Sequence, residues 1–259
     1  MQRGEDGGAI RAVLLDVGGT LWPDRPSAPQ VPGVEAPAPG TDPLVTAAAA
    51  RLSALVSLAA EEALVLATRL TDDRGAHLGE AQDTAGHVAR VVRAAGLADR
   101  GLDLGLVQRA MCLPAVDVLR PYAGAHELLR SARDLGLAVA VVSNALWRDG
   151  DAYRRDFTDL GLAGLVDAYV SSADVGYRKP HPAMFRTATD ALDVSPTATV
   201  MVGNSTAADI APARALGMRA VLVAIDDEPP EEARADAVCT SLGEVREWLV
   251  RTVGAHAPP

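Results

Sequence analysis

The sequence predicts an α/β fold, a doubly wound parallel sheet with an inserted helical domain. Two patterns carry this prediction. After residue 118, short apolar runs alternate with segments of helical spacing, which is typical of a parallel sheet with helices on both faces. Another apolar run lies near residue 13, and residues 44–116, which precede the alternating segment, have helical spacing without a strand pattern. We therefore expect the first strand to join the later sheet, with the intervening helices inserted after it.

The first expected strand covers residues 11–15 and ends in Asp16. Its unbroken apolar character indicates a strand that is buried on both faces. Gly18 and Gly19 follow, and residues without a Cβ let the backbone turn tightly and approach a ligand. Ligands of open α/β sheets bind at the carboxyl edge of the sheet. Asp16 at that edge can be a nucleophile, a metal ligand, or only a turn residue.

The composition changes after the first strand. Residues 23–43 hold seven prolines, so we expect a linker there rather than part of a core. Residues 44–116 are rich in helix formers, and their apolar spacing predicts about four helices. The predicted division is residues 1–22 and 118–259 for the α/β domain, and residues 23–117 for the linker and the helical domain.

The remaining expected elements alternate in order. Helices are expected at residues 125–135, 152–160 and 183–192, then in a segment that ends at Gly217, and last around Trp248. Strands are expected at residues 137–142, 168–170, 199–202 and 220–224. Ser241 and Glu244 have the spacing of a capping box for the closing helix.

Composition and charge exclude several function classes. The chain has 259 residues, of which 49% are hydrophobic, which is enough for a substantial core. Its 34 acidic and 24 basic side chains give a net charge of −10. This balance disfavours binding to nucleic acid or to an anionic membrane surface, because both need concentrated Lys and Arg. Any phosphate site must therefore depend on a few local cations, on helix amino termini or on a metal ion.

The sequence also favours a cytoplasmic protein. Its start is acidic where a secretory signal has a basic region followed by an apolar one. The most apolar longer segment, residues 44–70, is interrupted by charged residues, so we expect no membrane span. Cys112 and Cys239 show no paired spacing and are expected to be reduced thiols. The pattern is compatible with a monomer or a homodimer.

Polar residues follow three further strands of the predicted sheet. Ser143 and Asn144 come directly after the strand at residues 137–142, and Lys179 lies in a proline-rich turn before a helix. Asn204 and Asp209 come after the strand at residues 199–202. Because the carboxyl ends of parallel strands meet at one edge, we expect these groups to converge on Asp16. Such a set suits an oxyanion together with a hard cation, since Mg²⁺ prefers oxygen ligands.

The ordered set resembles the haloacid dehalogenase-like hydrolases. The matching positions are Asp16-Val17-Gly18-Gly19-Thr20, Ser143, Lys179 before Pro180, and Gly203-Asn204 with Asp209. The resemblance implies a Rossmann-like core, a helical cap inserted after the first strand, and a magnesium-dependent phosphatase reaction. It implies that Asp16 attacks phosphorus and becomes an aspartyl phosphate that water hydrolyses. It further implies binding of the phosphate by Thr20, Ser143, Asn144 and Lys179, and binding of Mg²⁺ by Asp16, the Gly18 carbonyl, Asn204 and Asp209.

Two positions depart from the family pattern. Gly18 stands where the family has a second aspartate, the usual general acid and base, whose contribution is ~10²- to 10⁴-fold. Asn204 stands where the family commonly has Asp, which removes a negative charge from the metal site. Asp24 and Asp174 are conceivable substitute acids. Asp209 can also be explained as a helix-capping residue if Thr206 is the N-cap, and the two roles are compatible.

Three functions remain open. The leading hypothesis is a phosphatase that acts on a small phosphorylated metabolite admitted beneath the helical cap. The alternative is a binding or regulatory protein with little turnover, because Gly18 cannot protonate a leaving group. A 2-haloacid dehalogenase is less favoured: the resemblance implies a tyrosine at position 18 and an arginine soon after, which Arg25 alone could match. The identity of the substrate cannot be read from the apolar helices of the insertion.

Overall fold

The computed structural model describes residues 9–23, 42–72, 81–226, 228 and 234–254. Its centre is a six-stranded, fully parallel sheet with the strand order β3-β2-β1-β4-β5-β6. The strands are β1 (Ala12–Leu15), β2 (Ala138–Ser143), β3 (Ala168–Ser171), β4 (Thr199–Gly203), β5 (Arg219–Val223) and β6 (Ala237–Cys239). The predicted α/β class and the parallel sheet are confirmed.

The register of the sheet brings the ends of three strands together. Leu15 of β1 pairs with Val141 of β2 on one side and with Val202 of β4 on the other. The residues that follow these strands therefore emerge at one edge. The strand order also reverses at β1, and ligands of open α/β sheets bind at such a reversal, outside the carboxyl ends of the strands.

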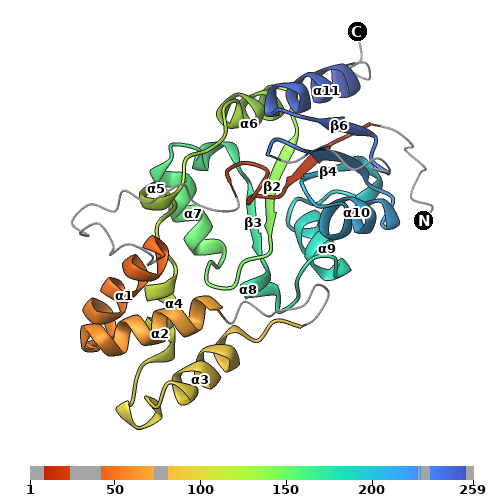
Figure 1. The fold of residues 1–259 in the computed structure, drawn as a ribbon. Helices are drawn as coiled ribbons and strands as arrows, with labels where there is room; N and C mark the ends of the chain where they lie inside the picture. The colour runs from red at the N-terminus through yellow and green to blue at the C-terminus, as the bar shows by residue number, and fades with distance from the viewer. Residues whose placement is uncertain (1–8, 24–41, 73–80, 227, 229–233, 255–259) are drawn as a thin grey trace.

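Helices cover both faces of the sheet (Figure 1). One face packs against α6 (Ala125–Asp134), α7 (Gly150–Asp159) and α11 (Leu242–Gly254), and the other against α9 (Pro182–Ala191) and α10 (Ala211–Ala215). Alternate residues of β1 serve the two layers: Val13 and Leu15 face the first, and Leu14 faces the second. Burial on both faces explains why these strands are apolar without a polar alternation.

The helices inserted after β1 build a hydrophobic core of their own. They are α1 (Pro43–Val56), α2 (Ala60–Asp72), α3 (Thr84–Ala94) and α4 (Leu104–Met111), which lie together at the lower left of Figure 1. Leu52, Leu66 and Val107 are fully buried there and come from three of these helices. The helical insertion is confirmed, while the division of the chain at residues 22 and 117 stays a prediction. We call α1–α4 the cap.

A segment before α3 docks the cap on the sheet domain. Gln82 donates from its backbone to Gly176 O at 2.7 Å and from its side chain to Ala145 O at 2.9 Å. Its side-chain oxygen accepts a hydrogen bond from Ser172 Oγ at 2.8 Å. A short helix, α5 (Ala115–Val118), carries the chain from α4 back to the sheet domain. The cap is therefore held at two places beside the carboxyl edge of the sheet.

Three details differ from the expectations. Strand β6 was not predicted, because three residues with one exposed apolar side chain give almost no pattern. The helix before Gly217 begins as a π-turn, Thr206–Ile210, and its N-cap is Ser205 rather than Thr206. In the closing helix, Ser241 Oγ accepts from Glu244 N at 3.2 Å, but the Glu244 carboxylate reaches back to Thr240 N at 2.7 Å.

Two further expectations concern the thiols and the membrane. Cys112 and Cys239 are both free, as predicted for reduced thiols. In the part of the chain that the structure describes, no helix combines the length and the apolar character needed to cross a bilayer.

Candidate active site

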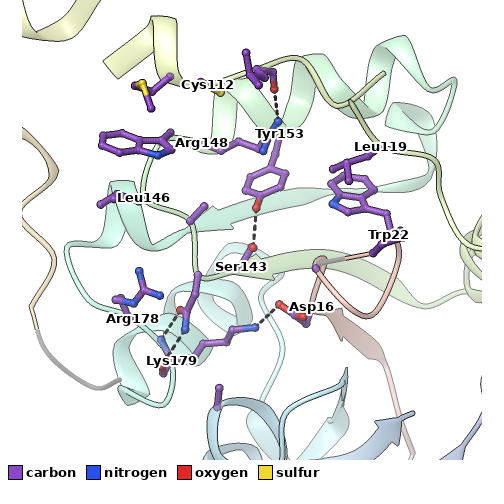
Figure 2. Close-up of a pocket in the computed structure, with 18 of the residues that line it drawn as sticks. Asp16, Trp22, Cys112, Leu119, Ser143, Leu146, Arg148, Tyr153, Arg178 and Lys179 are labelled. Atoms are coloured by element: carbon purple, nitrogen blue, oxygen red, sulfur yellow. Dashed lines mark hydrogen bonds and ion pairs between the residues drawn. The ribbon is translucent and has the colours of Figure 1, made fainter. Parts of the chain in front are cut away.

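Three charged side chains meet at the carboxyl edge of the sheet. Lys179 Nζ lies 2.6 Å from Asp16 Oδ1 and 2.7 Å from Asp209 Oδ1, and it donates to Val142 O at 2.8 Å. Asp16 follows β1, Asp209 follows β4, and Lys179 comes from the turn before α9. Figure 2 shows the Lys179 side chain extending toward Asp16. One ammonium group thus screens two carboxylates that would otherwise repel each other.

Burial makes this cluster electrostatically strong. The side chains of Lys179 and Asp209 are 2% and 1% exposed. Burial disfavours the ammonium form of Lys179, but Asp16 and Asp209 raise its pKa above the usual range, so it stays protonated. Burial also raises the pKa of Asp209 to about 6, against the opposing effect of Lys179. Lys179 and Asp209 therefore each depend on their charged neighbours to stay ionised.

Asn144 fixes the position of Lys179. Its side-chain nitrogen donates to Lys179 O at 2.9 Å, and its side-chain oxygen accepts from Lys179 N at 2.7 Å. Both polar atoms of the Asn144 side chain therefore form hydrogen bonds with the backbone of Lys179, which lies on a different loop. Asn144 is thereby placed to position Lys179, and its direct contact with the phosphate stays a prediction.

The sequence around Asp209 explains its orientation. A Cβ at Gly203 would lie 2.5 Å from Asp209 Cγ, so only glycine lets the carboxylate pack against the end of β4. Asp209 Oδ2 accepts a hydrogen bond from Ser205 N at 3.0 Å, and Ser205 Oγ accepts from Ala208 N at 3.1 Å. The capping role predicted for Asp209 is therefore real, but Ser205 is its partner. Asp209 Oδ1 is buried and contacts the Lys179 ammonium at 2.7 Å.

Two hydroxyl groups complete the centre. Thr20 Oγ1 donates to Asp16 Oδ2 at 3.2 Å, while Gly19 forms the preceding turn at φ 69°. Ser143 Oγ accepts a hydrogen bond from the Tyr153 hydroxyl at 2.7 Å, as Figure 2 shows. Burial raises the pKa of Tyr153 to about 12, so its hydroxyl remains a proton donor. Because Ser143 Oγ is the acceptor in this bond, the Ser143 hydroxyl can donate its own proton to another group.

A cavity of about 500 Å³ opens above this centre, between the sheet edge and the cap. Such a volume suits a small-molecule ligand. Of the predicted site residues, seven line it: Asp16, Gly18, Ser143, Asn144, Lys179, Asn204 and Asp209. Thr20 is fully buried and is not among the described lining residues. Asp174 does not line the cavity either, since its carboxylate accepts from Gly150 N at 2.7 Å, and Asp24 lies outside the described residues.

The oxygen atoms at the centre are of the types that bind a hard divalent cation. Asp16, the Gly18 carbonyl, Asn204 and Asp209 offer carboxylate, carbonyl and amide oxygens on one cavity wall, which is the ligand type that Mg²⁺ prefers. Asp209 Oδ1 is buried and already faces the Lys179 ammonium at 2.7 Å, so the fit to a metal ion rests on the chemistry of the oxygen set as a whole. Among the residues that the structure describes, no group of three or more His, Cys, Asp and Glu forms a metal site. The fit therefore depends on carbonyl and amide oxygens.

Arg148 belongs to another wall of the cavity and forms an ion pair with Asp156, which is not among the described lining residues. Arg148 Nε lies 2.5 Å from Asp156 Oδ2, and Arg148 Nη2 donates to Leu113 O. Asp156 Oδ1 accepts from Ala115 N at 2.8 Å. The pair thus fastens the chain between α4 and α5. The Arg148 guanidinium also lies 5.6 Å from the centre of the Tyr153 ring, which connects this wall with Ser143.

Many of the lining residues were not predicted as site residues from the sequence, and among them are Tyr153, Arg148 and Arg178. Tyr153 and Arg148 lie within the segment after β2 without any local motif, so no sequence pattern could single them out. Arg178 directly precedes Lys179, and that adjacency was the only available signal.

Comparisons with known proteins agree with this geometry. Residues 10–217 match the family model described as haloacid dehalogenase-like hydrolase. A phosphoserine phosphatase from Thermus thermophilus is 35% identical over 127 residues, which cover 49% of this chain and 49% of that protein. The chain thus spans about half the length of the curated relatives it matches.

Solved structures share the fold over nearly the whole chain. A phosphatase of this type from Thermococcus onnurineus superposes with a TM-score of 0.59 at 21% identity, covering 93% of this chain and 98% of that one. A 2-haloacid dehalogenase from Pseudomonas syringae superposes with a TM-score of 0.58 at 21% identity, covering 93% and 99%. Because phosphatases and dehalogenases share this architecture, the fold leaves the reaction open and the side chains of the site must decide it.

Proposed function

Since residues 10–217 match its model, the chain belongs to the haloacid dehalogenase-like hydrolases, and we propose that it is a magnesium-dependent phosphatase that forms an aspartyl phosphate on Asp16. Its substrate in this proposal is a small phosphorylated metabolite held between the sheet edge and the cap. The phosphoserine phosphatase relative supports a phosphate ester as the substrate class, although it matches over only half its length.

The observation that carries the proposal is the bridge of Lys179 between Asp16 and Asp209 at the floor of the cavity. A carboxylate that attacks a phosphate dianion meets charge repulsion, so the reaction needs cations at the point of attack. Lys179 is buried, protonated and 2.6 Å from the attacking carboxylate. A bound Mg²⁺ would add positive charge beside the same oxygens.

The proposed reaction has two steps. An oxygen of Asp16 attacks phosphorus, the ester P–O bond breaks, and the leaving oxygen takes a proton to become an alcohol. Water then attacks the phosphorus of the aspartyl phosphate, which releases inorganic phosphate and restores the carboxylate. Ser143, whose hydroxyl proton is left free by Tyr153, would donate to a phosphate oxygen in both steps.

The described residues of this site include no evident acid that could protonate the leaving group. No described carboxylate other than Asp16 and Asp209 lines the cavity, and both face Lys179. The proton must then come from water, which favours substrates with a good leaving group. This absence is also what supports the second candidate, a phosphate-binding protein of the same fold with little turnover.

Hydrolysis of para-nitrophenyl phosphate tests the proposal, because its phenolate leaves without acid assistance. Phosphate release should require Mg²⁺, stop with a chelator and disappear in Asp16→Asn. If no condition gives turnover while inorganic phosphate still binds, the binding-protein candidate replaces the phosphatase.

Gly18→Asp provides the matched gain-of-function test. Gly18 does not have the positive φ that Gly19 has, so an aspartate meets no left-handed backbone there. The variant should raise turnover of an alkyl phosphate by about 10-fold or more and change that of para-nitrophenyl phosphate much less. Equal effects on both esters would contradict the view that Gly18 removes the general acid.

A further inference from the structure

Arg178 is a cation of the cavity wall that the proposed chemistry does not use. It lies in the turn between α8 (Ser172–Val175) and α9, one residue before Lys179. Figure 2 shows its side chain beside Lys179 but turned toward Leu146, away from Asp16. Arg178 and Asp16 line the same cavity, so a ligand that reaches Asp16 lies in a space that the arginine also borders.

The cations that line this cavity differ in their partners. Lys179 contacts two carboxylates, and Arg148 is paired with Asp156. Within the described residues, Arg178 has no carboxylate partner: its Nη1 has only the neutral oxygen of Gln82, at 3.4 Å. Its Nε is buried and has no hydrogen-bond partner in the same part of the chain. The positive charge of Arg178 is therefore not balanced by any carboxylate of the described residues.

An unbalanced guanidinium at a partly buried position carries a desolvation cost. Burial lowers the pKa of Arg178 from its usual value, and no acidic group among the described residues opposes that shift. Arg remains charged under all ordinary conditions, so the cost persists until an anion contacts it. The guanidinium fork suits carboxylate and phosphate groups, which can accept two hydrogen bonds at once.

The turn that carries Arg178 is braced on both sides. The Tyr177 and His181 rings stack with their centroids 3.9 Å apart, and His181 N donates to Arg178 O at 2.8 Å. On the cap side, Ala81 bridges to Tyr177, and Gln82 N donates to Gly176 O at 2.7 Å. The arginine is thus presented by a fixed backbone rather than by a free loop, which is what a specific ligand contact needs.

We propose that Arg178 binds a second anionic group of the substrate, a carboxylate or a second phosphate, while the reacting phosphate sits at Asp16. This inference rests on the proposed phosphatase function. At the floor of the cavity the single ammonium of Lys179 is shared by two carboxylates and faces the reacting phosphate, so it leaves no cation there for a second anionic group. Arg178 supplies attraction at a separate place, and it therefore selects substrates that carry two anionic groups.

Matched substrate pairs test this selection. The first pair is O-phospho-3-hydroxypropanoate and its amide, which differ only in that the amide lacks the negative charge of the carboxylate. The second pair is 1,3-propanediol bisphosphate and the monophosphate, which distinguishes a second phosphate from a carboxylate. Phosphate release gives kcat/KM for each ester, and titration calorimetry with Asp16→Asn gives binding without turnover. The variants are Arg178→Gln, Arg178→Lys and, as a control, Arg186→Gln, whose side chain is exposed on α9 and does not line the cavity.

In the unsubstituted protein, the doubly anionic member of at least one pair should be preferred in both kcat/KM and binding. Arg178→Gln should reduce that preference by about 10- to 100-fold, the effect of losing a hydrogen bond to a charged group. Arg178→Lys should retain part of the preference, and Arg186→Gln should retain all of it.

The outcomes separate this inference from the proposed function. Equal losses for both members of each pair would overturn it, because they would mean that Arg178 only supports the turn or the Gln82 contact. Absence of any preference in the unsubstituted protein would overturn it as well. If no ester is hydrolysed but the binding preference depends on Arg178, the phosphatase proposal fails and the anion site stands.

Discussion

Replacing Asp156 by alanine should destabilise the protein severely. The carboxylate is 6% exposed and holds two partners, the Arg148 guanidinium at 2.5 Å and Ala115 N at 2.8 Å. Removing it leaves a buried cation without a counter-charge and a buried N–H without an acceptor. Breaking a buried ion pair from one side costs about 3–5 kcal/mol, a large share of the ~5–15 kcal/mol that stabilises an ordinary domain.

Urea denaturation at neutral pH measures this cost. At an unchanged slope, Asp156→Ala should lower the midpoint by about 1 M or more. The double variant Arg148→Met/Asp156→Leu should recover part of the loss, because it removes both charges together. About 1–3 kcal/mol should persist in the double variant, since Ala115 N still lacks an acceptor.

The same experiment can refute the reasoning. A loss below about 1 kcal/mol in Asp156→Ala would place this pair with exposed ion pairs, which contribute little. A double variant that is as unstable as the sum of the two single variants would show that Arg148 and Asp156 do not act as a pair. Either result would remove the argument that this contact fastens the chain between α4 and α5.

Three more predictions follow from the site. Tyr153→Phe removes the donor to Ser143 Oγ and should lower kcat by about 2- to 10-fold. Tyr169→Phe is the control and should leave kcat unchanged, because the Tyr169 hydroxyl has no hydrogen-bond partner among the described residues. Equal kcat values for the two variants in a phosphate-release assay would contradict the role of Tyr153. Burial raises the pKa of the Cys112 thiol and raises that of Cys239 to about 11, so fewer thiolates are present at neutral pH than for a free cysteine. Labelling by a disulfide reagent at pH 7 should therefore be slow and should accelerate as pH rises toward those values; rapid labelling of both thiols at pH 7 would be inconsistent with the burial of Cys239. Asn204→Asp adds a carboxylate to the oxygen ligands and should lower the Kd for Mg²⁺ in calorimetry, whereas an unchanged Kd would place Asn204 outside the metal site.

The parts of the fold that the sequence revealed are those with strong local patterns. The strands that became β1, β2, β4 and β5 are unbroken apolar runs, because both faces of each are buried. The convergence of Asp16, Lys179 and Asp209 was predictable for a topological reason: the carboxyl ends of parallel strands share one edge.

Other features depend on contacts that leave no local trace. The hydrogen bond from Tyr153 to Ser143 joins α7 to β2 through packing, and the pair of Arg148 and Asp156 matters only because a distant segment passes beside it. The N-cap residue of the helix that follows β4 was predicted to be Thr206 but is Ser205, because Ser and Thr are both favourable at an N-cap. That Arg178 has no carboxylate partner among the described residues is likewise a property of the folded chain alone.

The central claim, that Asp16 becomes phosphorylated during turnover, can be tested by trapping the enzyme. Acid quenching during turnover of para-nitrophenyl phosphate with Mg²⁺, followed by mass spectrometry of the peptide that contains residues 12–25, should show the added mass of one phosphoryl group on Asp16. Hydroxylamine, which cleaves acyl phosphates, should remove it, and Asp16→Asn should not acquire it. Turnover that requires Mg²⁺ but leaves no hydroxylamine-sensitive phosphoryl group on Asp16 would contradict the account.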